Sequence, residues 1–143
     1  MKRKTETTQS VGIKDVQRKW HLVDVKGKIL GRITPYIAKL LQGKHKSNYV
    51  PYLDSGDYVV VINASHVEVT GNKADMKSYS YYSGYPGGLK QIPYRRMMDK
   101  KPQEIIRHAV SGMLPKNKLR DRRLTRLYIY PKSENPYSDK FQS

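Results

Sequence analysis

Cysteine is absent from this sequence of 143 residues, which excludes disulfide bonds and thiolate metal sites. Acidic residues are few: 12 Asp and Glu stand against 28 Lys and Arg, so the formal net charge is +16 at pH 7. No apolar run reaches the roughly 18 residues of a membrane-spanning helix. The basic N-terminal stretch is not followed by an apolar segment, which argues against a secretory signal. The result is a basic chain of single-domain size whose partners carry negative charge, as nucleic acids and membrane surfaces both do.

Phenylalanine and tryptophan occur once each, whereas tyrosine occurs twelve times. Tyrosine combines a stacking face with a hydroxyl, which suits wet, polar interfaces. Four of these residues lie beside a glycine-rich loop at 84–90, namely Tyr79, Tyr81, Tyr82 and Tyr85. They can stack on unpaired RNA bases, or they can line a strand and cover a small core. The sequence favours neither alternative.

Strand and helix patterns alternate along the chain. Apolar and β-branched residues predict strands at 20–25, 57–63, 66–70 and 127–130, and the Tyr-rich stretch 78–83 is expected to be extended. Residues 57–63 are apolar on both faces, as in a strand that is covered from both sides. This order predicts a single α/β domain in which helices pack on a largely parallel sheet.

Two helices are predicted from apolar residues at helical spacing. In the first, Ile37 and Leu40 face the sheet and Lys39 faces solvent. Thr34 is expected to cap this helix and Gly43 to end it. The second begins at Pro102, and its apolar face comprises Ile105, Ile106, Ala109, Val110, Met113 and Leu114.

Features of common enzyme sites are incomplete. Gly27 and Gly31 follow a strand, as in a dinucleotide-binding turn, but that fingerprint needs three glycines at fixed spacing. No metal-ligand spacing occurs among the histidines, which are His21, His45, His66 and His108. Asp54 and Asp57 fit a turn and a strand start better than acid–base catalysis. We therefore predict no catalytic residue, cofactor, metal site or small-molecule substrate.

Positive charge recurs in segments that also contain glycine. Residues 26–53 contain no acid, and two of their basic side chains, Lys28 and Arg32, are predicted to bind nucleic-acid phosphates. The segment 112–130 carries a single acid, Asp121, and its basic residues are Lys116, Lys118, Arg120, Arg122, Arg123 and Arg126. Glycine lets backbone N–H groups approach a phosphate while Lys and Arg supply charge. We interpret the residues after Pro115 as a surface connection whose charge cannot be neutralised from inside the protein. A polyphosphate backbone is its natural counter-ion.

Six segments identify a family resemblance that covers residues about 19–131. They are WHLVDVKGKILGR at 20–32, LQGKHK at 41–46, YVPYLDSGDYVVVINA at 49–64, VTGNK at 69–73, YYSGYPGGLK at 81–90 and AVSGMLPKNKL at 109–119. In order and spacing they resemble the L-thirteen family of large-subunit ribosomal proteins. With this resemblance, the chain divides into an N-terminal extension at 1–18, flexible when free, an α/β domain at 19–131 and a tail at 132–143.

The resemblance implies a three-layer α/β/α domain that binds large-subunit ribosomal RNA (rRNA) and supports subunit assembly without catalysis. It also implies contacts with neighbouring large-subunit proteins and a location on cytoplasmic ribosomes, with an organellar ribosome as the alternative. No membrane partner is expected. Its RNA-facing positions fall on Lys44, His45, Lys46 and Lys73, on Tyr85, Gly87, Gly88 and Lys90 of the glycine loop, and on Lys116, Lys118, Arg120, Arg122 and Arg123.

Two other functions compete with this one. A small Rossmann-like enzyme would need a glycine fingerprint or an acid–base–nucleophile set, and the sequence contains neither. A DNA-compacting protein would need a repetitive or dimeric basic surface in place of irregular glycine–lysine loops. Sedimentation with large ribosomal subunits in moderate salt would distinguish the three.

Overall fold

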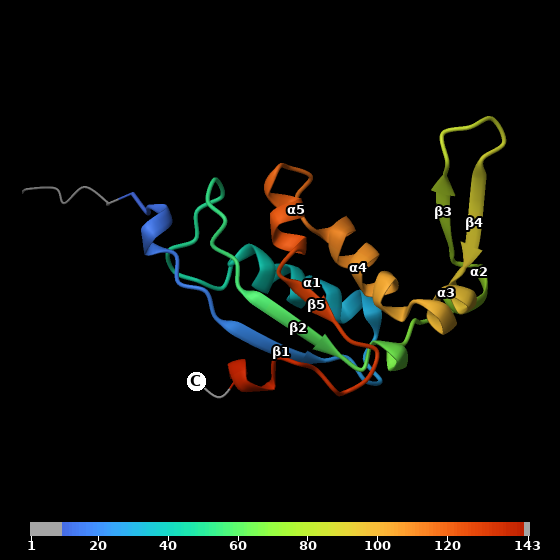
Figure 1. Cartoon of the computed structure of the whole chain (residues 1–143), viewed down its shortest axis with the longest axis horizontal. Coiled ribbons are helices and arrows are strands. Elements are labelled where there is room, and N and C mark those ends of the chain that lie inside the picture. Colours follow the sequence, from blue (N-terminus) through green and yellow to red (C-terminus); the bar gives the residue numbers. More distant parts are fainter. Residues whose placement is uncertain (1–9, 142–143) are drawn as a thin grey trace, which may run out of the picture.

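The structure, a computed structural model, describes residues 10–141 (Figure 1). Residues 1–9 of the predicted N-terminal extension therefore lie outside the described part. The elements in chain order are η1 (Ile13–Asp15), β1 (Trp20–Asp24), α1 (Leu30–Gln42), β2 (Tyr58–Ile62), η2 (Ala64–His66), α2 (Lys73–Met76), β3 (Ser78–Tyr82), β4 (Leu89–Pro93), α3 (Tyr94–Lys100), α4 (Pro102–Met113), α5 (Leu119–Leu124), β5 (Leu127–Ile129) and η3 (Ser138–Phe141).

The main sheet has three parallel strands in the order β1-β2-β5. Leu22, Val60 and Tyr128 are in register across it. Val59, Val60 and Val61 of the central strand have no exposed surface, which confirms the predicted strand covered on both faces. β3 and β4 form a separate antiparallel hairpin. The predicted α/β class with a mostly parallel sheet is confirmed.

Helices α1 and α4 cover one face of the sheet (Figure 1). Ile37 and Leu40 of α1 are buried and Lys39 is exposed, so the predicted helix face is confirmed. In α4, Ile105, Ile106 and Val110 are fully buried against this layer, and Leu114 is buried just after the helix. Met113, the last residue of the helix, was expected on the same face but is 44% exposed.

The other face of the sheet is covered by aromatic side chains and the C-terminal segment. The ring of Trp20 stacks on Tyr58 with centroids 4.5 Å apart, and on Tyr137 at 5.0 Å. Tyr137 also contacts Tyr128, whose centroid lies 4.7 Å away, and η3 packs beside β1. The layers are therefore helices, sheet, and an aromatic cover that includes residues of the C-terminal segment.

Helix α1 begins four residues before the predicted cap. Thr34 lies inside the helix and donates its hydroxyl to the carbonyl of Leu30 at 2.6 Å, so the prediction of an N-cap there was wrong. The earlier start is held by Glu68, whose carbonyl accepts the Leu30 N–H at 2.8 Å. Gly43 ends the helix with a left-handed backbone, as predicted.

Two further segments differ from the sequence-based expectations. The strand predicted at 66–70 is reduced to an isolated bridge between Ile29 and Glu68, and its first residue, His66, belongs to η2 instead. The basic segment after Pro115 was interpreted as a connection, but it contains the helix α5. This helix rests on α1 and α4, which gives part of the segment an inner side.

Candidate nucleic-acid interface

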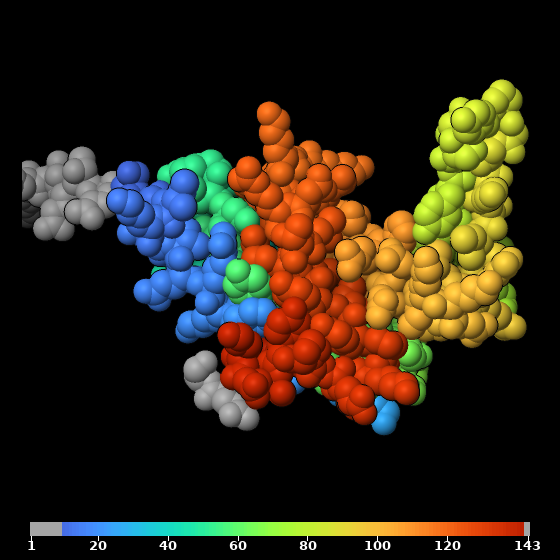
Figure 2. Space-filling model, in the orientation of Figure 1, coloured from blue at the N-terminus to red at the C-terminus, as the bar shows by residue number. Residues whose placement is uncertain are grey.

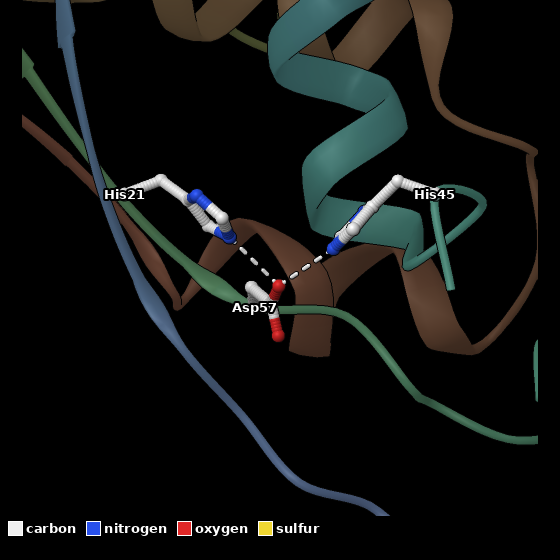
Figure 3. Close-up of side chains that lie close together, drawn as sticks. All are labelled: His21, His45 and Asp57. Carbon is white, nitrogen blue, oxygen red and sulfur yellow. Dashed lines mark hydrogen bonds and ion pairs between the residues drawn. The ribbon is translucent and has the colours of Figure 1, made fainter. Parts of the chain in front are cut away.

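Asp57 is a buried carboxylate directly before β2, and three cationic or imidazole side chains converge on it. Two of them, His21 and His45, are shown in Figure 3. Its Oδ2 is hydrogen-bonded to Nε2 of His21 at 2.8 Å and lies 2.9 Å from Nε2 of His45. Its Oδ1 lies 2.5 Å from Nζ of Lys46 and accepts the backbone N–H of Lys19 at 3.0 Å. The side chain thus ties β1, the connection after α1 and the start of β2 together.

The charge on Asp57 is stabilised by these partners. Burial acts to raise the pKa of this carboxyl group. The hydrogen bonds from Lys46, His21 and the Lys19 amide outweigh burial and hold the pKa below its ordinary value of 3.8. The carboxylate is therefore ionised at neutral pH and favours positive charge beside it.

The ligand atoms of His21, His45 and Asp57 lie within 4.8 Å of one another, a set that could hold a transition metal. Sequence spacing did not indicate this cluster because the three residues come from separate segments. Its carboxylate, however, already has a partner at each oxygen. The Lys46 ammonium beside Oδ1 also opposes a second cation. We therefore assign the cluster a structural role.

Lys46 uses all its donors inside the protein. Besides Asp57, its Nζ donates to the carbonyls of Gln17 at 2.5 Å and Ser55 at 2.8 Å. The bond to Gln17 fixes the segment before β1 against the connection after α1. The side chains of Lys46 and His45 were both predicted to face RNA, and the structure gives each an internal partner.

Asp54 forms a second internal cluster with arginines. Arg126 binds it through two nitrogens, both at 2.5 Å, and Nε of Arg123 lies 3.8 Å away. The side chain of Arg123 is 1% exposed, and that of Arg126 is 8% exposed. Arg18 approaches the same carboxylate from the segment before β1 at 3.8 Å. The interpretation that charge in 112–130 cannot be neutralised from inside was therefore wrong for Arg126, whereas Arg123 shares the same single carboxylate at a longer distance.

All but one of the remaining predicted cations face solvent. Those that are exposed and form no ion pair within residues 10–141 are Lys28, Arg32, Lys44, Lys73, Lys90, Lys116, Lys118 and Arg122. Arg120 is half-buried and lies 3.7 Å from Asp121. These residues form separate groups: Lys73 and Lys90 belong to the region of the hairpin at one end of the molecule, and α5 lies over its middle (Figure 1).

The glycine loop forms the turn of the β3–β4 hairpin. Gly84 and Gly87 have φ values of +86° and +70°, a conformation that favours glycine. Tyr85 projects from the turn and is 75% exposed. A Cβ on Gly88 would lie 2.0 Å from Oγ of Ser83, so this position accepts no side chain without rearrangement.

The tyrosines of β3 differ in burial. Tyr79 is half-buried against the core, and burial, together with Tyr94 and Tyr81, raises its pKa to about 12. Tyr81 and Tyr82 are exposed. Tyr79 therefore packs as a strand residue, whereas the other two leave their rings accessible.

Residues 18–136 match the family model described as Ribosomal protein L13. The chain belongs to this family. A protein of Clostridioides difficile named large ribosomal subunit protein uL13 is 57% identical over 124 residues, which cover 87% of each chain. A protein of the same name from Caldanaerobacter subterraneus is 54% identical over 86% of this chain and 86% of its own length. Another from Thermotoga petrophila is 48% identical over 92% of this chain and 89% of its own length.

Membership of this family confirms the resemblance on which the sequence-based expectations rest. The chain is a structural ribosomal protein and not an enzyme. Among residues 10–141, no helix has the length and apolar character needed to cross a membrane.

Proposed function

We propose that this protein is a structural component of the large ribosomal subunit, where it binds large-subunit rRNA and supports assembly. The relatives described above carry the name of a large-subunit protein. Neighbouring large-subunit proteins are the second class of partner. The proposed location is on the ribosome in the cytoplasm.

The observation that carries the RNA-binding proposal is the set of exposed cations without internal partners. In α5 and the turn before it, Lys116, Lys118 and Arg122 are exposed, whereas Arg123 is buried beside Asp54. The segment thus has an inner side that serves the fold and an outer side that carries free positive charge. Phosphates neutralise such charge and release counter-ions, which supplies affinity.

The other proposed contacts are the loops that combine glycine with lysine. Lys44 follows Gly43, Lys73 begins α2 after Gly71, and Lys90 lies in β4 after the hairpin turn. Lys46 and His45 contribute differently, because their contacts with Asp57 shape the connection that presents Lys44. Phosphate contacts of this kind position a protein on RNA.

The test is co-sedimentation of the tagged full chain with large ribosomal subunits in moderate salt, beside filter binding to large-subunit rRNA. We expect the protein to remain with the subunit, and log affinity to fall by about 0.7–0.9 per log unit of salt for each neutralised phosphate. Equal affinity for duplex DNA of the same length would favour the DNA-compacting alternative. A salt slope near zero would contradict charge-driven binding.

A further inference from the structure

A groove opens where the β3–β4 hairpin meets α3. Its volume is about 690 Å³. The apolar part of its lining comes from Tyr81 of β3, Ile92 of β4 and Met97 of α3. The hairpin stands clear of the rest of the surface (Figure 2), so large ligands can reach its base.

Positive charge surrounds this apolar lining. The groove's cations are Lys90, Arg96, Lys100 and Lys101, all of which are exposed. None of them forms an ion pair within the part of the chain that the structure describes. No acid lines the groove. A fitting ligand therefore has an apolar portion with negative charge close to it.

Tyr81 is held in place but remains accessible. Alternation along β3 puts Tyr79 and Tyr81 on the same face, and both rings approach His108 of α4, with centroids 5.4 and 6.4 Å away. Tyr79 is half-buried, whereas Tyr81 keeps 43% of its surface exposed. Tyr81 thus presents an aromatic surface whose position is set by the contact with α4.

We propose that this groove binds one unpaired base of rRNA together with its flanking phosphates. The inference rests on the proposed rRNA-binding function and names a specific recognition site for it. The base stacks on Tyr81 above Ile92 and Met97, as unpaired bases do on aromatic side chains.

The cations of the groove supply the rest of the recognition. Lys90 on the hairpin and Lys100 and Lys101 at the end of α3 flank the base from two elements, so phosphates on both its sides have a partner. A neutral or basic peptide would leave these charges uncompensated. The groove's charge therefore favours a polyanion with apolar rings, which describes single-stranded RNA.

The experiment compares Tyr81→Leu, Tyr81→Phe and Tyr82→Leu by filter binding to large-subunit rRNA. Leucine keeps apolar volume but removes the stacking face, so affinity should fall roughly 5- to 150-fold, the range for one stacked base. Phenylalanine keeps the ring, and Tyr81→Phe should bind like the unchanged protein. Tyr82 is a matched control because it is exposed on the opposite face of the same strand. Thermal melts establish that each variant is folded.

A second measurement locates the base directly. Large-subunit rRNA containing 4-thiouridine is cross-linked to the full chain by near-ultraviolet light, and the modified peptides are identified by mass spectrometry. We expect a cross-link within the groove that Tyr81→Leu removes. Equal losses of rRNA affinity for Tyr81→Leu and Tyr82→Leu, or no loss for either, would overturn the proposal that the groove binds a base. The proposed rRNA-binding function would stay intact. Normal rRNA affinity with weakened incorporation into subunits would overturn it in favour of a protein ligand. Failure of the unchanged protein to bind rRNA would contradict the proposed function itself.

Discussion

Arg126 forms a bidentate pair of hydrogen bonds with Asp54, with Nη1 2.5 Å from Oδ2 and Nη2 2.5 Å from Oδ1. The two residues are separated by 72 positions in the sequence. Asp54 lies in the connection that leads to β2, and Arg126 lies directly before β5. The pair therefore fastens together the entrances of two adjacent parallel strands.

Removing Asp54 should destabilise the fold strongly. Asp54→Asn leaves the buried guanidinium groups of Arg123 and Arg126 without a counter-charge, and we expect a loss of about 3–5 kcal/mol in the free energy of unfolding. Urea unfolding of the free protein measures it. Asp121→Asn is the matched control, because Asp121 is exposed and lies 3.7 Å from Arg120; it should cost less than about 0.5 kcal/mol. Equal small effects would mean that the Asp54 cluster contributes little.

Asp57 should make the free energy of unfolding depend on pH in the acidic range. Its pKa is lowered in the folded protein, so its contribution is fully present above the ordinary value of 3.8 and is lost as pH falls through the folded value. Asp57→Asn should therefore be less stable than the unchanged protein at pH 7. The difference should shrink as pH is lowered below 3.8. Urea midpoints measured across this range test the prediction, and a difference that stays constant would contradict it.

Two glycines should respond in opposite ways to alanine. A Cβ on Gly56 would lie 1.7 Å from the carbonyl oxygen of Leu41, so Gly56→Ala should destabilise by about 1–3 kcal/mol or more. Gly112 lies in α4 and is exposed, and beyond its chain neighbours and the backbone of its own helix no atom lies within 4 Å of the corresponding position. Gly112→Ala should stabilise the helix by roughly 0.5–1 kcal/mol. Thermal melts of the two variants measure these changes. A lower melting temperature for both variants would contradict the prediction for Gly112.

Substitutions of the exposed charges on α5 and in the turn before it should weaken rRNA binding without weakening the fold. Replacing Lys116, Lys118 and Arg122 with Gln removes exposed charge and no buried volume. The melting temperature of the free protein should stay the same or rise slightly, since self-repulsion falls. The rRNA salt slope should decrease by about 2–3 if each residue neutralises one phosphate. Arg123→Gln should instead lower the melting temperature, because its side chain is 1% exposed beside Asp54. An unchanged salt slope would remove this segment from the RNA-binding surface.

Local patterns in the sequence predicted much of the sheet and helix framework. The apolar run of β2 indicated a strand covered on both faces, and the spacing of Ile37 and Leu40 indicated the buried face of α1. Gly43 marked the end of this helix because its left-handed backbone suits glycine. These features depend on neighbours within a few residues, which periodicity and turn chemistry capture.

The internal ion pairs were not predictable in this way. Asp54 and Asp57 fit a turn, but their partners lie up to 72 positions away and meet them only when the parallel strands align. The same limit applies to α5, whose burial of Arg123 depends on Asp54. Charge density alone therefore overestimated the free charge of the segment 112–130. The predicted RNA-binding positions themselves stay a prediction.

The position of β5 in the sheet has a consequence for synthesis of the chain. β2 is the central strand, yet one of its two neighbours is made more than 60 residues after it. Until β5 has left the ribosome that translates it, the valine-rich β2 has an open edge, the kind of surface that pairs with other chains and aggregates. A chain that stops before Leu127 leaves this edge of β2 unpaired, and we expect such a fragment to aggregate more readily than the full chain.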